Sequence, residues 1–318
     1  MKWEQRYTPA MQLVPMDFKF CLDSLRPRIG RYGWLWRALR TIGARSGRFP
    51  VDAHRALQHF GSAARPYFVA RTSNDVLFIG DHRDPEAVAL ACDPTYGSAM
   101  LHFLEARLRR MNGPFLDIGC GIGVESAAIA KAVGSRVDVL AFEPNVRSAR
   151  LAAATFALNG LSNVRLFPIA ISDFDGELAT HGTLTSMDST PPPMPAKTVA
   201  TNTTVLCRTL DGLMDSGAIT RSALMRIHEG VDGVRALSGA RRVLSNLRPT
   251  IVALTDSSEA PENDTDMWRI CTVIDSAAPY NYKVVQSDAD SKTLGLVGLN
   301  AAASNQAGYP LFCTPALG

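Results

Sequence analysis

A loop with three glycines in five residues, placed directly after a short apolar run, constrains the fold of this chain more than any other feature. Asp117 stands near the end of the apolar run, and the loop that follows contains Gly119, Gly121 and Gly123. A second apolar run ends at Glu143, 20 residues after the last of these glycines. Glycines permit a tight turn and close backbone approach, and an acid at the second strand end can accept hydrogen bonds from ribose hydroxyls. The pattern therefore predicts a βαβ unit that binds a nucleotide-like ligand at its strand ends.

The spacing of the glycines indicates which ligand this is. A dinucleotide-binding loop has the pattern Gly-x-Gly-x-x-Gly, and counting from Gly119 its third glycine would fall at Val124. A branched side chain there would obstruct the close helix–strand packing against a pyrophosphate, so an NAD(P) enzyme is disfavoured. Asp-x-Gly-x-Gly-x-Gly is instead the pattern of S-adenosylmethionine (SAM) methyltransferases, whose cofactor has no phosphate. We therefore expect SAM as the cofactor.

Apolar and amphipathic segments alternate regularly along the chain, which predicts an α/β fold with a Rossmann-like, doubly wound, mostly parallel sheet and helices on both faces. The expected strands are 75–80, 114–118, 137–143, 163–171, 205–207, 224–227, 250–254 and 282–285, with apolar pieces at 294–298 and 310–313. The expected helices are 84–90, 98–110, 124–134, 145–159, one from Leu210, 231–246 and 264–276. A proline-rich excursion at 188–203 is interpreted as a lid or as a plain insertion.

Two domains are expected from this organisation. Residues 96–318 contain the glycine loop and form the SAM-dependent methyltransferase domain, and residues 1–95 form a mainly helical N-terminal extension that covers substrate or contacts a second subunit. Residues 1–60 contain 11 Lys/Arg against 4 Asp/Glu, whereas the whole chain has a formal charge of +3. That overall charge is too small to predict nucleic-acid binding. Segment 26–48 interleaves aromatic and basic residues, and we favour a packed helix over a membrane or nucleic-acid surface.

Cysteine and histidine spacing argues against a metal site. The six cysteines include no Cys-x-x-Cys pair, which disfavours zinc and a disulfide framework and suits a reducing cytosol. Four of the histidines show no ligand spacing, so we predict no metal: His54, His59, His82 and His102. No apolar run reaches the roughly 18–20 residues that cross a bilayer, and the first residues lack the apolar segment of a signal peptide. We therefore expect a cytoplasmic protein.

Residues 113–254 resemble the FkbM-like family of SAM-dependent methyltransferases. The most specific pieces are Phe-Glu-Pro-Asn at 142–145, Leu-Asn-Gly at 158–160 and Asn-Val at 163–164, in this order; further pieces lie at 115–119, 170–176, 209–211 and 237–240. The resemblance implies a class I methyltransferase that O-methylates a hydroxyl, often on a sugar, polyketide or other small metabolite. The expected partner is thus a hydroxyl-bearing small molecule or glycan and not a nucleic acid. A homodimer and peripheral membrane contact through 26–48 stay open.

The resemblance also implies the cofactor-binding residues. Those expected to line the methionine part of SAM are Asp117, Gly119, Gly121 and Gly123. Those expected at the ribose are Glu143, which would bind the diol, and Asn145 or Pro144, which would flank it. Those expected to frame the adenine are the backbone of Ala170 and Ile171 and the nearby Asp173.

The chain departs from the family pattern at the end of the fourth strand. The family has acids there, whereas this chain has His228, Glu229 and Gly230, followed by Asp232. His228 is the candidate general base, by position and by the pKa of imidazole, although a structural histidine that binds the loop backbone is an equal alternative. Glu229 could orient His228 or bind acceptor hydroxyls. Asp232 is better explained as an acid in the first turn of a helix.

Two other function classes stay open at this point. The altered strand end is compatible with a degenerate methyltransferase fold that binds SAM, or nothing, and acts as an interaction or regulatory protein. The basic and aromatic segment 26–48 is compatible with a protein that binds a membrane surface or a nucleic acid, which added salt would weaken.

Overall fold

The structure is a computed structural model, and it describes residues 67–81, 84–93, 95, 97–181, 202–228, 230–254, 266–287, 294–298 and 310–316. The basic and aromatic segment 26–48, almost all of the proline-rich excursion and Glu229 lie outside these residues. The chain divides into two compact units, which are described separately: Met1–Thr72 with Ile79–Tyr96, and Ser73–Phe78 with Gly97–Gly318.

The described residues before position 97 form two strands and one helix. Strands β1 (Tyr67–Arg71) and β2 (Leu77–Asp81) pair in a two-stranded sheet, which confirms the strand expected near 75–80. Helix α4 (Pro85–Cys92) begins after Asp84, whose carboxylate accepts the amides of the first turn. The described part of the extension thus contains strands as well as the expected helix.

The second unit is built on a sheet of eight strands in the order β12-β11-β13-β10-β9-β3-β4-β5. The five adjacent parallel strands are β3 (Phe115–Ile118), β4 (Val139–Phe142), β5 (Val164–Phe167), β9 (Leu224–Ile227) and β10 (Thr250–Ala253). The remaining strands are β11 (Tyr280–Ser287), β12 (Leu294–Gly298) and β13 (Leu311–Pro315), and β13 runs antiparallel to both β10 and β11.

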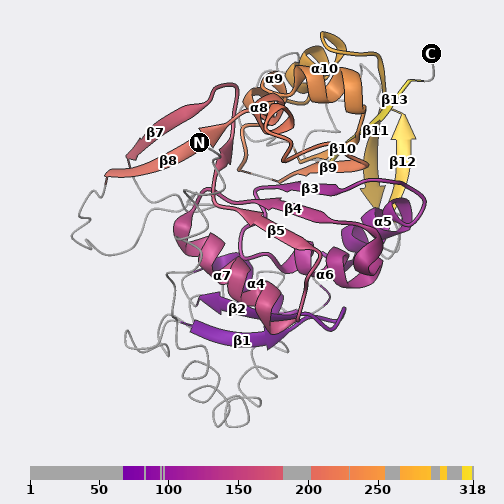
Figure 1. Ribbon diagram of the computed structural model, residues 1–318. Helices are drawn as coiled ribbons and strands as arrows, with labels where there is room; N and C mark the ends of the chain where they lie inside the picture. The colour runs from indigo at the N-terminus through magenta and orange to yellow at the C-terminus, as the bar shows by residue number, and fades with distance from the viewer. Residues whose placement is uncertain are drawn as a thin grey trace. The chain divides into compact units, whose positions relative to one another are not determined.

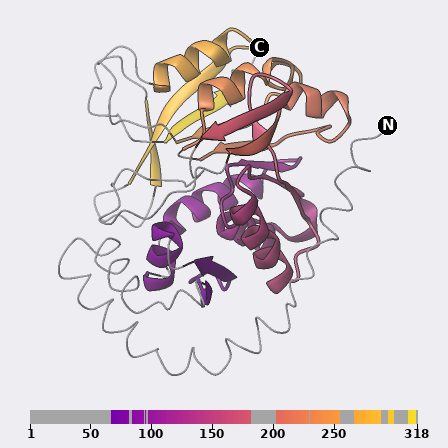
Figure 2. The ribbon, with the colours of Figure 1, turned by 90° about the vertical axis from the view of Figure 1, so that its left-hand side faces the viewer.

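Helices cover both faces of this sheet. The helices of this unit are α5 (Ser98–Leu108), α6 (Val124–Val133), α7 (Val146–Leu158), α8 (Leu210–Asp215), α9 (Gly233–Ser238) and α10 (Asp266–Asp275). Helices α6 and α7 lie on one face, and α9 and α10 lie on the other (Figures 1 and 2). All residues of β3, β4, β9 and β10 are buried, as parallel strands covered on both faces must be. The predicted Rossmann-like, doubly wound fold is confirmed.

The strand expected over 163–171 is broken at Pro168. Strand β5 ends at Phe167, and Ala170–Ile171 form β6 in a different, three-stranded sheet with β8 (Asn202–Arg208) and β7 (Gly176–His181), in the order β6-β8-β7. Proline has no amide hydrogen to donate, so the ladder with β4 cannot continue through it. Residues 163–171 are therefore one continuous run in the sequence, but they contribute strands to two different sheets.

The helix expected over 231–246 is also broken, at Gly239. Helix α9 ends at Ser238, and a side chain at Gly239 would meet the Ser172 carbonyl oxygen at 2.1 Å. The helix resumes beyond this close approach and ends in a π-helical turn, Val243–Leu247. The close passage of the chain at Ser172 therefore requires glycine at the position of the break.

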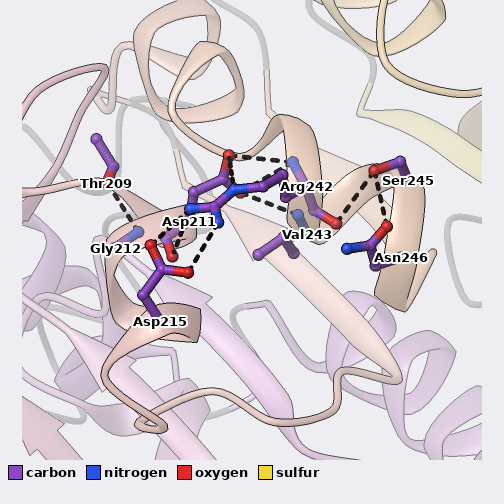
Figure 3. Close-up of polar contacts among 8 residues, drawn as sticks. All are labelled: Thr209, Asp211, Gly212, Asp215, Arg242, Val243, Ser245 and Asn246. Atoms are coloured by element: carbon purple, nitrogen blue, oxygen red, sulfur yellow. Dashed lines mark hydrogen bonds and ion pairs between the residues drawn. The ribbon is translucent and has the colours of Figure 1, made fainter.

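Asp211 caps the resumed helix (Figure 3). Its carboxylate accepts the amide of Arg242 at 3.0 Å and that of Val243 at 2.9 Å, while its own amide donates to the Gly239 carbonyl. The Arg242 guanidinium in turn pairs with Asp215 at 2.7 Å. Two motifs of the family resemblance, 209–211 and 237–240, are thus joined by a structural contact. No helix in the described part of the chain is long and apolar enough to span a membrane.

Candidate functional site

The carboxyl ends of β3, β4 and β9 meet where the strand order of the sheet reverses. From β3 the chain proceeds to β4 on one side, and β9 lies on the other side. Ligands of open α/β sheets bind in the crevice at such a switch point. The glycine loop follows β3, Glu143 follows β4, and His228 follows β9. The topology therefore brings together residues that are far apart in the sequence.

The three glycines of the loop have different roles. All have positive φ angles, +85° at Gly119, +56° at Gly121 and +78° at Gly123. A Cβ at Gly119 would meet Val231 at 2.5 Å, and one at Gly123 would meet Phe156 at 2.8 Å. A Cβ at Gly121 would meet nothing within 4 Å. Packing thus demands the first and third glycines, whereas the second faces open space through which a ligand can approach the backbone.

Most amides of the glycine loop donate hydrogen bonds within the protein. The amides of Gly119 and Cys120 both donate to the Phe142 carbonyl, at 2.9 and 3.0 Å. The Gly123 amide donates to the Cys120 carbonyl at 2.9 Å, and the Gly121 amide donates to a carboxylate at the end of β4. A loop that cradles phosphate directs free amides at the ligand. This loop does not have that arrangement.

Glu143 provides the carboxylate that binds Gly121. One carboxylate oxygen accepts the Gly121 amide at 2.8 Å, and the other accepts the Asn145 amide at 2.8 Å. The Asn145 side chain caps helix α7. Burial raises the pKa of Glu143 to about 7, against the opposing effect of the two backbone hydrogen bonds. The structure therefore holds the carboxyl group of Glu143 in contact with Gly121, the glycine whose Cβ position is open.

The buried Asp117 of β3 pairs with the partly buried His228, which follows β9. The His228 Nε2 atom lies 2.7 Å from Asp117 Oδ1, and the Ser126 hydroxyl donates to Asp117 Oδ2. Burial and the Arg226 charge lower the pKa of His228, but Asp117 and Glu125 outweigh them and the net shift is upward. Burial raises the pKa of Asp117, yet the charge and hydrogen bond of His228 bring it below its usual value. The surroundings of His228 therefore stabilise its protonated form and raise its proton affinity.

A second ion pair completes what we call the switch-point cluster, defined as Asp117, Glu125, Arg226 and His228. Arg226 is buried in β9, level with Asp117 in β3, and its guanidinium pairs with Glu125 in the first turn of α6. The Glu125 carboxylate lies 3.6 Å from His228 Nε2. Two carboxylates thus face two cationic groups, and the cluster is neutral when His228 is protonated.

The residues expected around the adenine lie in and after the small sheet. Ala170 and Ile171 pair with β8, and Ile171 is buried. Asp173 accepts hydrogen bonds from Arg235 Nε at 2.9 Å and from the Ser172 hydroxyl at 3.1 Å. The Arg235 hydrogen bond lowers the pKa of Asp173. In the described part of the chain no hydrogen bond or ion pair joins Asp173 to the glycine loop, so its role at the adenine stays a prediction.

The structure tests the expected role of one of the two acids near His228 but not that of the other. Asp232 caps α9 by accepting the Arg235 amide at 2.9 Å, which confirms its interpretation as a helix-start residue. Glu229 lies outside the described residues, and its proposed role stays a prediction. Among the described residues, no group of three or more His, Cys, Asp or Glu is arranged to hold a metal ion.

Sequence reasoning missed Glu125, Ser126 and Arg226. Glu125 and Ser126 directly follow the glycine loop, and Arg226 is a charged residue inside an otherwise apolar strand. A buried charge in a central strand requires a partner, so Arg226 was the available signal. Its partner depends on the packing of α6 against the sheet, which the sequence does not specify.

Comparison with known proteins identifies no family for this chain. No family model and no curated protein matches it. Among solved structures, it is similar to methyltransferase FkbM from Methylobacillus flagellatus, with 14% identity and a TM-score of 0.41 over 63% of this chain and 43% of that one. It is also similar to a SAM-dependent methyltransferase from Aquifex aeolicus, with 15% identity and a TM-score of 0.38 over 70% and 94%.

A third similar structure is the O-methyltransferase TomG from Streptomyces achromogenes, which was solved in complex with SAM. It has 13% identity and a TM-score of 0.39 over 70% of this chain and 80% of that one. Similarity this distant does not define an activity, and the first of the three matches spans less than half of its relative. The function must therefore be argued from the site.

Proposed function

We propose that this protein is a SAM-dependent methyltransferase that transfers a methyl group to a hydroxyl of a small metabolite or sugar. One observation carries the proposal: the carboxylate of Glu143, at the end of β4, binds the amide of Gly121, the glycine that faces open space. A nucleoside ligand at a switch point needs an acid for its ribose and an open backbone beside it. These two features are adjacent here.

The backbone amides of the glycine loop favour a cofactor without phosphates. The loop amides at Gly119, Cys120 and Gly123 are bonded to carbonyl groups, so they do not form an anion cradle. Glu143 itself does not distinguish the two cofactors, because an acid at this strand end also binds the ribose in dinucleotide-binding folds. The site therefore fits SAM better than NAD(P).

SAM supplies an activated methyl group when it is bound, so the chain has to position the acceptor, exclude water and remove a proton. Glu143 would hold the ribose hydroxyls, and the open side of Gly121 would allow close approach. An alcohol is almost fully protonated at neutral pH, so a base accelerates its reaction. We assign this role to His228, which lies at the end of β9 beside the loop. Glu229 is the second candidate for contact with the acceptor.

A structure of the full chain with S-adenosylhomocysteine tests this proposal. We expect the ribose against Glu143, the sulfur near the glycine loop, and His228 on the side where the methyl group would stand. A complex in which the ligand lies away from Glu143, or a crevice that stays empty at saturating ligand, would overturn the assignment.

A further inference from the structure

The carboxylate of Asp117 has both oxygens engaged inside the protein. Oδ1 contacts His228 and Oδ2 accepts the Ser126 hydroxyl, and the residue is 1% exposed. Its position in the glycine motif implied a place beside the cofactor. In the structure, however, His228 lies against one of its oxygens and Ser126 against the other.

The contact with Asp117 decides which nitrogen of His228 is basic. A carboxylate at Nε2 selects the neutral tautomer that carries its proton on Nε2, so the free lone pair is on Nδ1. Within the described part of the chain, Nδ1 has no hydrogen-bond partner, and 17% of the side chain is exposed. The His228 amide donates to the Ile118 carbonyl at 3.0 Å, which fixes the backbone at the strand end. The backbone amide and the Nε2 atom of His228 are therefore both held by hydrogen bonds, and Nδ1 remains without one among the described residues.

We infer that Asp117 is a positioning residue, which holds the imidazole of His228 so that Nδ1 receives the proton of the acceptor hydroxyl, and that it does not bind the cofactor. The role of Nδ1 rests on the proposed function. In the transfer, the hydroxyl oxygen forms the bond to the methyl carbon, the electron pair of the cleaved carbon–sulfur bond stays on sulfur, and the proton moves to Nδ1.

Charged groups from four elements surround the imidazolium that this step produces. Asp117 from β3 and Glu125 from α6 stabilise it, and Arg226 from β9 opposes it while being neutralised by Glu125. Glu143, at the end of β4, also interacts favourably with the positive charge. The acids outnumber the single opposing cation, so the site can accept a proton without creating an uncompensated buried charge.

The decisive measurement is nitrogen NMR of the histidine side chains in the full chain, with and without Asp117→Asn. The spectrum of His228→Gln identifies the His228 signals among the six histidines. We expect the neutral imidazole of the unaltered protein to carry its proton on Nε2, and the pKa of His228 to fall in Asp117→Asn. Asp138→Asn changes an exposed acid just before β4 and should leave both readouts unchanged. A proton on Nδ1 in the unaltered protein would overturn the inference even if the Asp117 variant does not fold.

Cofactor affinity supplies the second readout. We expect Asp117→Asn to change SAM affinity by less than about threefold, because loss of a direct hydrogen bond to a charged group costs tenfold or more. If Asp117→Asn loses SAM binding while the pKa and the tautomer of His228 stay unchanged, Asp117 binds the cofactor and the inference is wrong. If the unaltered protein binds no SAM, the proposed function fails, but the tautomer and the pKa shift still decide the role of Asp117.

Discussion

The Nε2 atom of His228 lies 2.7 Å from Oδ1 of Asp117, although 111 positions separate the two residues in the sequence. The contact forms because β3 and β9 are parallel neighbours, with Asp117 level with Arg226 and His228 two positions further on. It connects the acid of the glycine motif with the histidine at the strand end where the chain departs from the FkbM-like pattern. The two features therefore act as one unit.

Replacing Glu143 by alanine should weaken SAM binding by about 1–3 kcal/mol, the cost of losing hydrogen bonds to a charged group. Titration calorimetry measures this directly. The matched control is Asp138→Ala, which removes an exposed acid just before β4, the strand that Glu143 follows. This variant should bind SAM normally. Thermal unfolding must accompany the titration, because the variant also leaves the Gly121 and Asn145 amides unpaired. Unchanged affinity in a folded Glu143→Ala protein would remove Glu143 from the ribose site.

Glu143 should also make stability depend on pH. Its pKa is raised from 4.5 to about 7 in the folded protein, so its contribution is fully present below pH 4.5 and is lost as pH rises through 7. The loss is at most about 3 kcal/mol, since one pKa unit corresponds to ~1.4 kcal/mol. The free energy of unfolding, measured in urea for the unaltered protein and for Glu143→Gln, should diverge across this range. A difference between the two that is constant with pH would contradict the burial argument.

Alanine at Gly121 should mainly weaken SAM binding, whereas alanine at Gly123 should mainly destabilise the fold. At Gly121 the new methyl group meets nothing, so the cost is the roughly 1–2 kcal/mol of a left-handed residue, and the protein should fold. The methyl group would occupy the open side of the loop and weaken SAM binding. At Gly123 it meets Phe156 at 2.8 Å, which adds about 1–3 kcal/mol of overpacking. Urea unfolding and SAM titration of both variants test this, and normal SAM affinity in Gly121→Ala would place the ligand elsewhere.

Asp211→Ala should destabilise the protein by about 0.5–2 kcal/mol, because it removes the cap of the resumed helix at Arg242 and Val243. Asp215→Ala is the control, since it removes only an ion pair between two exposed side chains and should have little effect. Neither variant should alter SAM affinity. Equal destabilisation by the two changes in urea unfolding would show that the capping bonds contribute nothing beyond the ion pair.

The sequence predicted the parallel core because its signals there are local. Apolar strands, an alanine-rich helix and a helix-ending Asn-Gly pair at 159–160 each specify their own element, and alternation then implies a parallel sheet. The two broken elements depend on distant contacts. The chain breaks at Pro168, and β6 after it belongs to a second sheet. Gly239 is required because the Ser172 carbonyl oxygen leaves no room for a side chain. No local pattern identifies these neighbours.

At the site, the sequence indicated which strand ends matter but not how their residues pair. The spacing of Glu143 from the glycine loop predicted an acid beside it, and the structure places its carboxylate on the Gly121 amide. The sequence treated Asp117 and His228 as separate groups, since only the register of β3 against β9 brings them together. The Arg226–Glu125 pair could not be predicted either, because it depends on how helix α6 packs against the sheet.

Titration of SAM into the full, unaltered chain tests the central claim most directly, with NAD and NADP as competing ligands. We predict saturable binding of one SAM per chain, similar binding of S-adenosylhomocysteine, and no binding of either dinucleotide. Absence of SAM binding, or binding of a dinucleotide in its place, would contradict the account of the glycine loop and Glu143.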